Sequence, residues 1–199
     1  MGLAFTNTAA TTAAVTNRLV TSTNMINAAY TLANTSAVWS GGFTITATIT
    51  AVTGNDAAGT LAVVGKSLSG QAVTETITLT DGVGGTGSQI FKSVASITGA
   101  GWTINVGNDT IVIGVAAGNF ACGSGGSLGG VLVNNSVAAT VVISDARGTI
   151  LTVPSSQAAG TYYNLGGVDF SGYLKVATTN TNDVTIFHTP TIPYGTTLA

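Results

Sequence analysis

Hydrophobic and polar residues alternate in short runs along most of this chain. From Phe43 to Val52, phenylalanine, isoleucine, alanine or valine alternates with threonine for most of the run. Side chains at alternate positions of a β-strand point to opposite faces of a sheet. This alternation therefore predicts a strand with one buried face and one exposed face. Residues Ala72–Leu79 alternate in the same way, with three threonines on one face, at Thr74, Thr76 and Thr78.

Glycine, asparagine, aspartate and serine interrupt these runs at intervals of roughly 8–12 residues, which is typical of antiparallel sandwiches and barrels. The predicted strands are Phe43–Val52, Leu61–Gly65, Ala72–Leu79, Ile90–Ile97, Trp102–Val106, Thr110–Val115, Val131–Asn134, Ala139–Ser144, Ile150–Val153, Thr161–Leu165, Tyr173–Ala177 and Val184–His188. We expect the fifth and sixth of these to form a hairpin. The fold class that follows is all-β, with two antiparallel β-sandwich or jelly-roll-like units and an extended N-terminal arm.

Changes in composition suggest how the chain divides. The N-terminal segment keeps neither helical nor strand periodicity for long, so we expect it to become ordered on a partner or on the first sheet, with one short helix within 24–33 as an option. A later segment rich in glycine and serine is typical of a linker. The expected division is an arm at 1–36, a first sandwich at 37–118, a linker at 119–130, a second sandwich at 131–190 and a tail at 191–199.

The charge of the chain is low. Charged residues make up 6% of the 199 residues, against roughly 25% in an average soluble domain, and the net charge is −2. The five basic residues are scattered, so we expect no nucleic-acid partner. No apolar run of about 18 residues is present, so we expect no membrane partner. A surface of threonine, asparagine, serine and glycine causes little repulsion between copies, which suits assembly.

Two stretches resemble phosphate-binding motifs without their context. Gly59–Ser67 places its first glycine one residue too far from the Gly-Lys pair of a P-loop, so we expect Lys66 to be exposed at a strand end. Gly82–Gly87 matches the pattern GxGxxG, but no βαβ unit surrounds it. We interpret this second stretch as a loop and expect no cofactor.

The residues capable of catalysis or metal binding have no obvious partners. The acidic residues are Asp56, Glu75, Asp81, Asp109, Asp145, Asp169 and Asp183. Most of the aspartates adjoin glycine or asparagine in apparent turns, where the side chain caps its own backbone. Glu75 lies within a predicted strand, where it could pair with Lys92 across the sheet or face another subunit.

His188 is the only histidine and Cys122 the only cysteine, which excludes a histidine-rich metal site and an internal disulfide. We expect His188 at the surface or an interface and Cys122 in a glycine-rich connector. The aromatic residues expected in the core or at interfaces, rather than in a sugar-binding platform, are Trp39, Trp102, Tyr162, Tyr163 and Tyr173. We therefore predict no catalytic residue, no metal site and no enzymatic activity.

Several stretches resemble β-modules of structural proteins from tailed bacteriophages. Gly65–Leu79 fits the pattern G-x-x-x-x-G-x-x-x-x-E-x-I, Phe91–Thr98 fits F-K-x-V-x-x-I, and Ile104–Gly107 fits an x-V-G turn. The second half resembles a β-sandwich module common in capsid decoration and head-fibre proteins. The stretches that carry this second resemblance are Val131–Asn134, Ile143–Leu151, Gly172–Val176 and Asp183–Ile186.

The resemblance implies a virion structural protein without an active site. We expect it to decorate and stabilise, or cement, the surface of a bacteriophage capsid through β-edge and arm contacts, after synthesis in the host cytoplasm. Its partners would be the major capsid protein and further copies of itself, as a homo-oligomer such as a trimer. The alternative is a tail or head-fibre protein that shares the β-modules and binds host-surface glycans through its loops.

Overall fold

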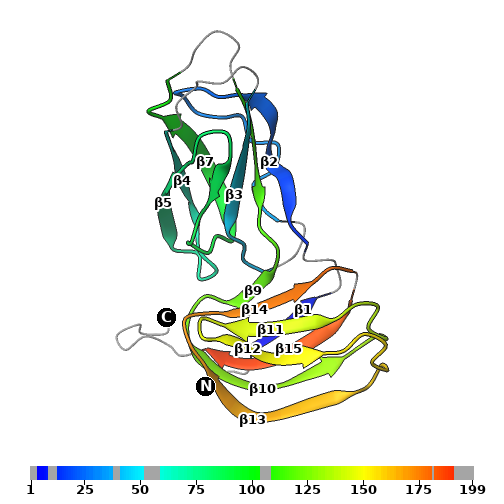
Figure 1. Cartoon of the computed structure of the whole chain (residues 1–199). Coiled ribbons are helices and arrows are strands. Elements are labelled where there is room, and N and C mark those ends of the chain that lie inside the picture. Colours follow the sequence, from blue (N-terminus) through cyan, green and yellow to red (C-terminus); the bar gives the residue numbers. More distant parts are fainter. Residues whose placement is uncertain are drawn as a thin grey trace. The chain divides into compact units, whose positions relative to one another are not determined.

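The computed structural model describes residues 4–8, 13–37, 41–51, 59–103, 109–180 and 182–190 (Figure 1). For residues 4–8 only the backbone is described. The described residues form fifteen strands and no helix, and the paired strands run antiparallel. The prediction of an all-β protein with two sandwich-like units is therefore confirmed.

The chain divides into two compact units that are not consecutive in sequence. Unit 1 comprises Met1–Thr12, Trp39–Gly41 and Gly118–Ala199, and unit 2 comprises Ala13–Val38 and Gly42–Ala117. Unit 2 is thus inserted near the N-terminal end of unit 1. Both ends of the chain belong to unit 1.

Unit 1 is a jelly roll (Figure 1). Its strands are β1 (Ala4–Thr8), β9 (Asn119–Cys122), β10 (Gly126–Val133), β11 (Val141–Asp145), β12 (Gly148–Val153), β13 (Tyr162–Phe170), β14 (Leu174–Thr178) and β15 (Val184–Pro190). They form two sheets, in the orders β1-β15-β10-β13 and β12-β11-β14-β9. Counted along unit 1, the first strand pairs with the eighth, the second with the seventh, the third with the sixth and the fourth with the fifth. Such nested pairs are those of one long antiparallel ribbon folded over into a double sheet.

The core of unit 1 lies between these two sheets. Alternate residues of the strands point into it, as the sequence pattern predicts. Its fully buried side chains include Leu128, Val131, Val133, Val141, Ile143, Val153, Leu174, Val176, Val184 and Ile186. Most are β-branched, and such residues pack well on a pleated surface.

Unit 2 is a second sandwich, with seven strands. Its strands are β2 (Val15–Asn24), β3 (Ile45–Thr50), β4 (Thr60–Lys66), β5 (Ala72–Thr78), β6 (Gly84–Thr86), β7 (Ser93–Ala100) and β8 (Thr110–Val115). They form sheets in the orders β2-β8-β3-β6 and β5-β4-β7. Phe43 and Phe91 are fully buried, and each backbone N–H donates to the carbonyl of the other at 2.8 Å.

The N-terminal segment differs from the arm that we expected. It supplies β1 to unit 1, where β1 pairs with β15, and β2 to unit 2, where β2 pairs with β8. The register of β2 against β8 shifts twice, so its buried residues Leu19 and Val20 follow no simple period. The expected short helix is absent; instead Tyr30 N–H donates to the carbonyl of Ile97 in β7 at 2.9 Å.

The glycine-rich segment also differs from the linker that we expected. It contains all of β9 and the first five of the eight residues of β10. The expected hairpin between 102–106 and 110–115 lies partly outside the described residues, and β8 pairs instead with β2 and β3. The expected tail at 191–199 lies outside the described residues.

Candidate functional site

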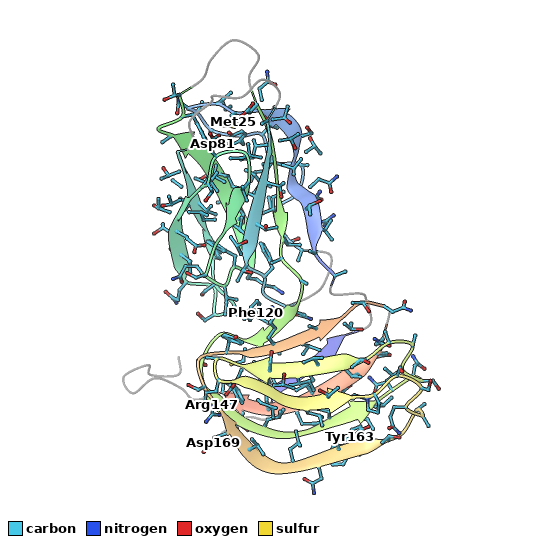
Figure 2. The ribbon with its side chains drawn as sticks, viewed as in Figure 1. Met25, Asp81, Phe120, Arg147, Tyr163 and Asp169 are labelled. Carbon is cyan, nitrogen blue, oxygen red and sulfur yellow. The ribbon has the colours of Figure 1, made fainter. Side chains whose placement is uncertain are left out.

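A shallow depression of about 350 Å³ lies in unit 1 between the β11–β12 turn and β13. Its walls combine the apolar residues Ile150, Leu165 and Val168 with polar residues of the turn. Figure 2 shows Arg147 and Asp169 at this place, and the Arg147 guanidinium donates a hydrogen bond from Nη2 to the backbone carbonyl of Asp169. The charged groups at this place are the first candidate for chemistry.

Asp145 is the buried centre of this depression. Its Oδ1 accepts hydrogen bonds from the backbone amides of Arg147 (2.8 Å) and Gly148 (3.2 Å). Its Oδ2 accepts from the Ser171 amide and from Arg147 Nε, both at 2.9 Å. Both carboxylate oxygens are occupied, so the group braces the β11–β12 turn against the segment that follows β13.

The protonation of Asp145 follows from these contacts. Burial alone would raise the pKa of the Asp145 carboxyl, but the Ser171 and Arg147 amides and the Arg147 guanidinium together hold its pKa below the ordinary value. A general acid or base needs a pKa near the working pH. Asp145 is therefore suited to a structural role.

Glu75 of β5 and Lys66 of β4 do not form a joint site. Glu75 Oε1 accepts hydrogen bonds from the amides of Ser88 (2.5 Å) and Gln89 (3.1 Å), and from Ser88 Oγ (3.1 Å). The carboxylate thus holds the segment between β6 and β7 against β5. Lys66 is the exposed last residue of β4, at the strand end where we expected it. Within the loop predicted at residues 82–87, the short strand β6 pairs with β3.

His188, which we expected at the surface or an interface, is buried within unit 1. It is 3% exposed, lies on the same inward face of β15 as the buried Val184 and Ile186, and its ring meets that of Phe170 edge-on at 6.3 Å. Burial lowers the pKa of the His188 imidazole. Cys122 is also buried, with its Sγ 3.4 Å from Ser124 Oγ.

One aromatic side chain is prominent on the outside of unit 1. Tyr162 of β13 is 51% exposed and meets the ring of Phe187 edge-on at 5.9 Å. A Cβ at Gly130 would overlap the phenol of Tyr162, so the glycine allows this ring to lie against the sheet. Trp102 is buried, and Tyr173 packs edge-on against Phe120 at 5.2 Å. Trp39 lies outside the described residues.

The outer face of the β5-β4-β7 sheet forms the second surface of interest. We call its exposed residues Ala62, Val64, Thr74, Thr76 and Thr78 the threonine face. Register places Thr74 beside Val64 and Thr76 beside Ala62. The face is therefore built from small uncharged side chains on a regular pair of strands, with the exposed Lys66 as one charge on the same side of β4, at its end beside Ala72.

Comparison of the chain with protein-family models, with curated proteins and with solved structures found no match. Among the described residues, no three histidine, cysteine or acidic side chains come together as a metal-ion site would require. The part of the chain that the structure describes also contains no helix of the length and apolar character needed to cross a bilayer. The features with the clearest means of contacting a partner are the threonine face and the Tyr162 ring.

Proposed function

We propose that this protein is a structural component of a bacteriophage virion that decorates and stabilises the capsid surface. The observation that carries the proposal is the threonine face, an exposed sheet surface of small uncharged side chains with a single lysine at its end, on a chain with 6% charged residues. Such a surface can approach a second protein closely without removing charges from water, which would be costly. The resemblance of the sequence to phage β-modules supports the same conclusion.

In the proposed function the protein acts by binding alone. Each copy would contact the major capsid protein and neighbouring copies, with no reaction and no cofactor. A shell presents the same site many times, so contacts that are weak singly become strong when a linked set engages together. Two all-β units suit this role because their backbone hydrogen bonds hold the contacting faces in shape.

The location is tested by labelling purified particles from the source of this chain with a gold-conjugated antibody against the protein. We expect label over the capsid surface. Label confined to tails would favour the fibre function, and absence of the protein from particles would overturn both.

The contact surface is tested with a matched pair of variants in unit 2. Val64 on the threonine face is 41% exposed, and Val83 in a turn away from that face is 65% exposed. Val64→Asp places a charge in the proposed contact, and Val83→Asp places the same charge elsewhere. We expect Val64→Asp to bind undecorated capsids at least about tenfold more weakly than Val83→Asp, since burying an unpaired carboxylate is costly. Equal binding by the two variants would refute the role of this face.

The second candidate function is that of a tail or head-fibre protein that binds host glycans. The observation in its favour is the half-exposed Tyr162 ring, which presents an apolar face and a polar hydroxyl together. A glycan array probed with the wild type and with Tyr162→Ala tests it. Glycan binding that is lost in Tyr162→Ala would favour this function over capsid decoration.

A further inference from the structure

We propose that two copies of this chain associate through the free edges of β5, in antiparallel register about Thr74, so that two three-stranded sheets become one six-stranded sheet. The inference goes beyond capsid decoration and does not depend on it. It concerns which edge of the molecule is built to accept a second copy.

The outward-facing groups of β5 follow from one hydrogen bond. The Leu79 amide donates to the carbonyl of Gly59 at 3.0 Å, just beyond the paired residues Thr78 and Thr60. In an antiparallel ladder the residues alternate between bonding the neighbouring strand and facing away from it. The odd-numbered residues of β5 therefore bond β4, and the even-numbered residues direct their N–H and C=O groups outward. In the part of the chain that the structure describes, no backbone hydrogen bond reaches these outward groups of residues 72, 74, 76 and 78.

Apart from β1, a five-residue edge strand with an uninterrupted register, the other sheet edges carry features that hinder pairing with another chain. The register of β2, β9, β12 and β13 is interrupted by shifts, and β6 has three residues. The outer edge of β7 is covered by an earlier segment, through Tyr30 N–H to Ile97 O and Val94 N–H to Thr35 O. Proteins use bulges, short strands and coverage to prevent edge-to-edge association.

By contrast, the register of β5 is uninterrupted, and among the described residues no other segment bonds its outward backbone groups. The strand pairs with β4 over seven residues without a shift, and it contains no proline. It is the longest edge strand in the described structure with an uninterrupted register. Its one charged residue, Glu75, is held by Ser88 and Gln89. Figure 1 shows β5 as the outermost strand of its sheet.

The partner follows from the symmetry of such a pairing. An antiparallel pair of identical strands has a two-fold axis, so each copy offers the same groups to the other. Centred on Thr74, the pairing places Thr74 opposite itself, Ala72 opposite Thr76 of the second copy, and Glu75 opposite Val73. No two carboxylates face each other, whereas a register centred on Glu75 would oppose them directly.

Crowding at one end of β5 favours Thr74 over Thr76 as the centre of the register. A register centred on Thr76 needs the carbonyl of Thr78, which Gly85 approaches so closely that a Cβ there would lie 2.8 Å from this oxygen. A register centred on Thr74 uses the outward groups of Ala72, Thr74 and Thr76 alone. It leaves the crowded end of β5 outside the pairing.

Disulfide cross-linking tests the register. In the proposed dimer the two Thr74 residues form a hydrogen-bonded pair with Cα atoms about 5.5 Å apart, a separation that a disulfide spans. The matched control is Thr76→Cys, on the same strand, with the same orientation and also exposed. Its two copies lie about 13 Å apart in this register, because they are displaced by four residues. Wild type reports any contribution of the buried Cys122.

Under mild oxidation we expect Thr74→Cys to form covalent dimers at least about tenfold faster than Thr76→Cys. Equal rates, or no dimer from either variant, would overturn the proposal.

Sedimentation equilibrium tests the edge without an added thiol. The Thr76 N–H faces outward, so Thr76→Pro removes a donor from the dimer and none from the β4 ladder. Thr76→Val keeps the N–H and serves as the control. We expect the dimer dissociation constant to rise at least about tenfold in Thr76→Pro and to stay near the wild-type value in Thr76→Val, with thermal unfolding as the check on folding.

Equal association of the proline and valine variants would overturn the proposal, and if Thr76→Pro does not fold, the cysteine pair decides. Both experiments use the purified protein alone. Their result is therefore separate from that of the capsid-binding experiment.

Discussion

Replacement of Asp145 by alanine is expected to destabilise unit 1 more than any change to its ion-pair partner. The carboxylate satisfies the amides of Arg147, Gly148 and Ser171, and it also pairs with the Arg147 guanidinium at 2.8 Å. Asp145→Ala removes all four interactions and leaves the three amides without these acceptors. Arg147→Ala removes the guanidinium and keeps the amide.

The magnitudes of the two changes should differ clearly. Hydrogen bonds to a charged group contribute roughly 1.5–3 kcal/mol each, without simple additivity, and Asp145→Ala removes at least three of them. We expect Asp145→Ala to lower the free energy of unfolding of unit 1 by about 3–5 kcal/mol. The Arg147 side chain is 62% exposed, and exposed ion pairs contribute at most about 1 kcal/mol. We expect Arg147→Ala to cost no more than that.

The effect of Asp145 also has a defined pH dependence. The folded-state pKa of Asp145 is lowered from its ordinary value of 3.8. A group with a lowered folded pKa stabilises the fold above its unfolded pKa, and this contribution is lost as the pH falls through the folded pKa. The difference in unfolding free energy between wild type and Asp145→Asn should therefore be constant above about pH 5 and shrink below about pH 4.

Urea unfolding at pH 7 and across the acid range measures both effects. Hydrogen exchange at β11 and β12 assigns the loss to unit 1 rather than unit 2. The reasoning is refuted if Arg147→Ala costs as much as Asp145→Ala, or if Asp145→Ala costs less than about 1 kcal/mol.

Three further predictions concern other places in the fold. Asn182→Ala should lower the unfolding free energy of unit 1 by about 2–3 kcal/mol, because the buried Oδ1 of Asn182 accepts hydrogen bonds from the amides of residues 138 and 139 at 2.8 and 3.3 Å. A loss of unfolding free energy below about 0.5 kcal/mol, measured in urea, would contradict this. Gly84→Ala should cost unit 2 about 1–3 kcal/mol, because Gly84 has φ +113° and a Cβ there would overlap the backbone carbonyl of Ala47; Gly82→Ala, at φ +61° with open space, is the milder control. Burial lowers the pKa of His188, so unfolding takes up a proton and wild-type stability should fall as the pH drops below about 6.5. His188→Leu should show a flatter profile of urea midpoints between about pH 7.5 and 5. Parallel profiles for wild type and variant would contradict the assignment of this pH dependence to His188.

The alternation of the sequence predicts the regular strands well. The pattern at residues 43–52 contains β3, and that at 72–79 contains β5. Their apolar positions, such as Ile45, Ile49 and Ile77, are buried as expected. These strands pair without register shifts, so the two-residue repeat of side-chain direction continues along the whole of each strand.

Where the period fails, the cause is a tertiary contact. The glycines of β10 suggested a linker, but Gly126 and Gly130 lie where a Cβ would overlap the rings of Phe170 and Tyr162. They allow aromatic side chains from β13 to approach the strand, which is a known use of glycine within sheets. A residue whose contact partner lies tens of residues away in the sequence carries no local signal of that contact.

The candidate site shows the same limit. The local sequence Asp-Ala-Arg-Gly at 145–148 indicates a tight turn, but the bond of Asp145 to the Ser171 amide depends on how β13 returns to that turn. The burial of His188 likewise depends on the pairing of β15 with β10, which places residue 188 opposite Leu128. The sequence therefore indicates which side chains can brace or titrate, and the topology determines which of them do.

The insertion of unit 2 near the start of the jelly roll sets the order in which the protein can be completed during synthesis. The strands of unit 2 are all synthesised by residue 115, so β2 can pair with β8 soon after they leave the ribosome, while much of unit 1 is still missing. The first strand of the jelly roll must wait for the last, because residue 4 pairs with residue 188. Contacts between such distant residues form slowly, and domains complete on the ribosome from the N-terminal side. A chain that stops before residue 184 would therefore be expected to hold a finished unit 2 beside an unclosed jelly roll, which a protease would remove first.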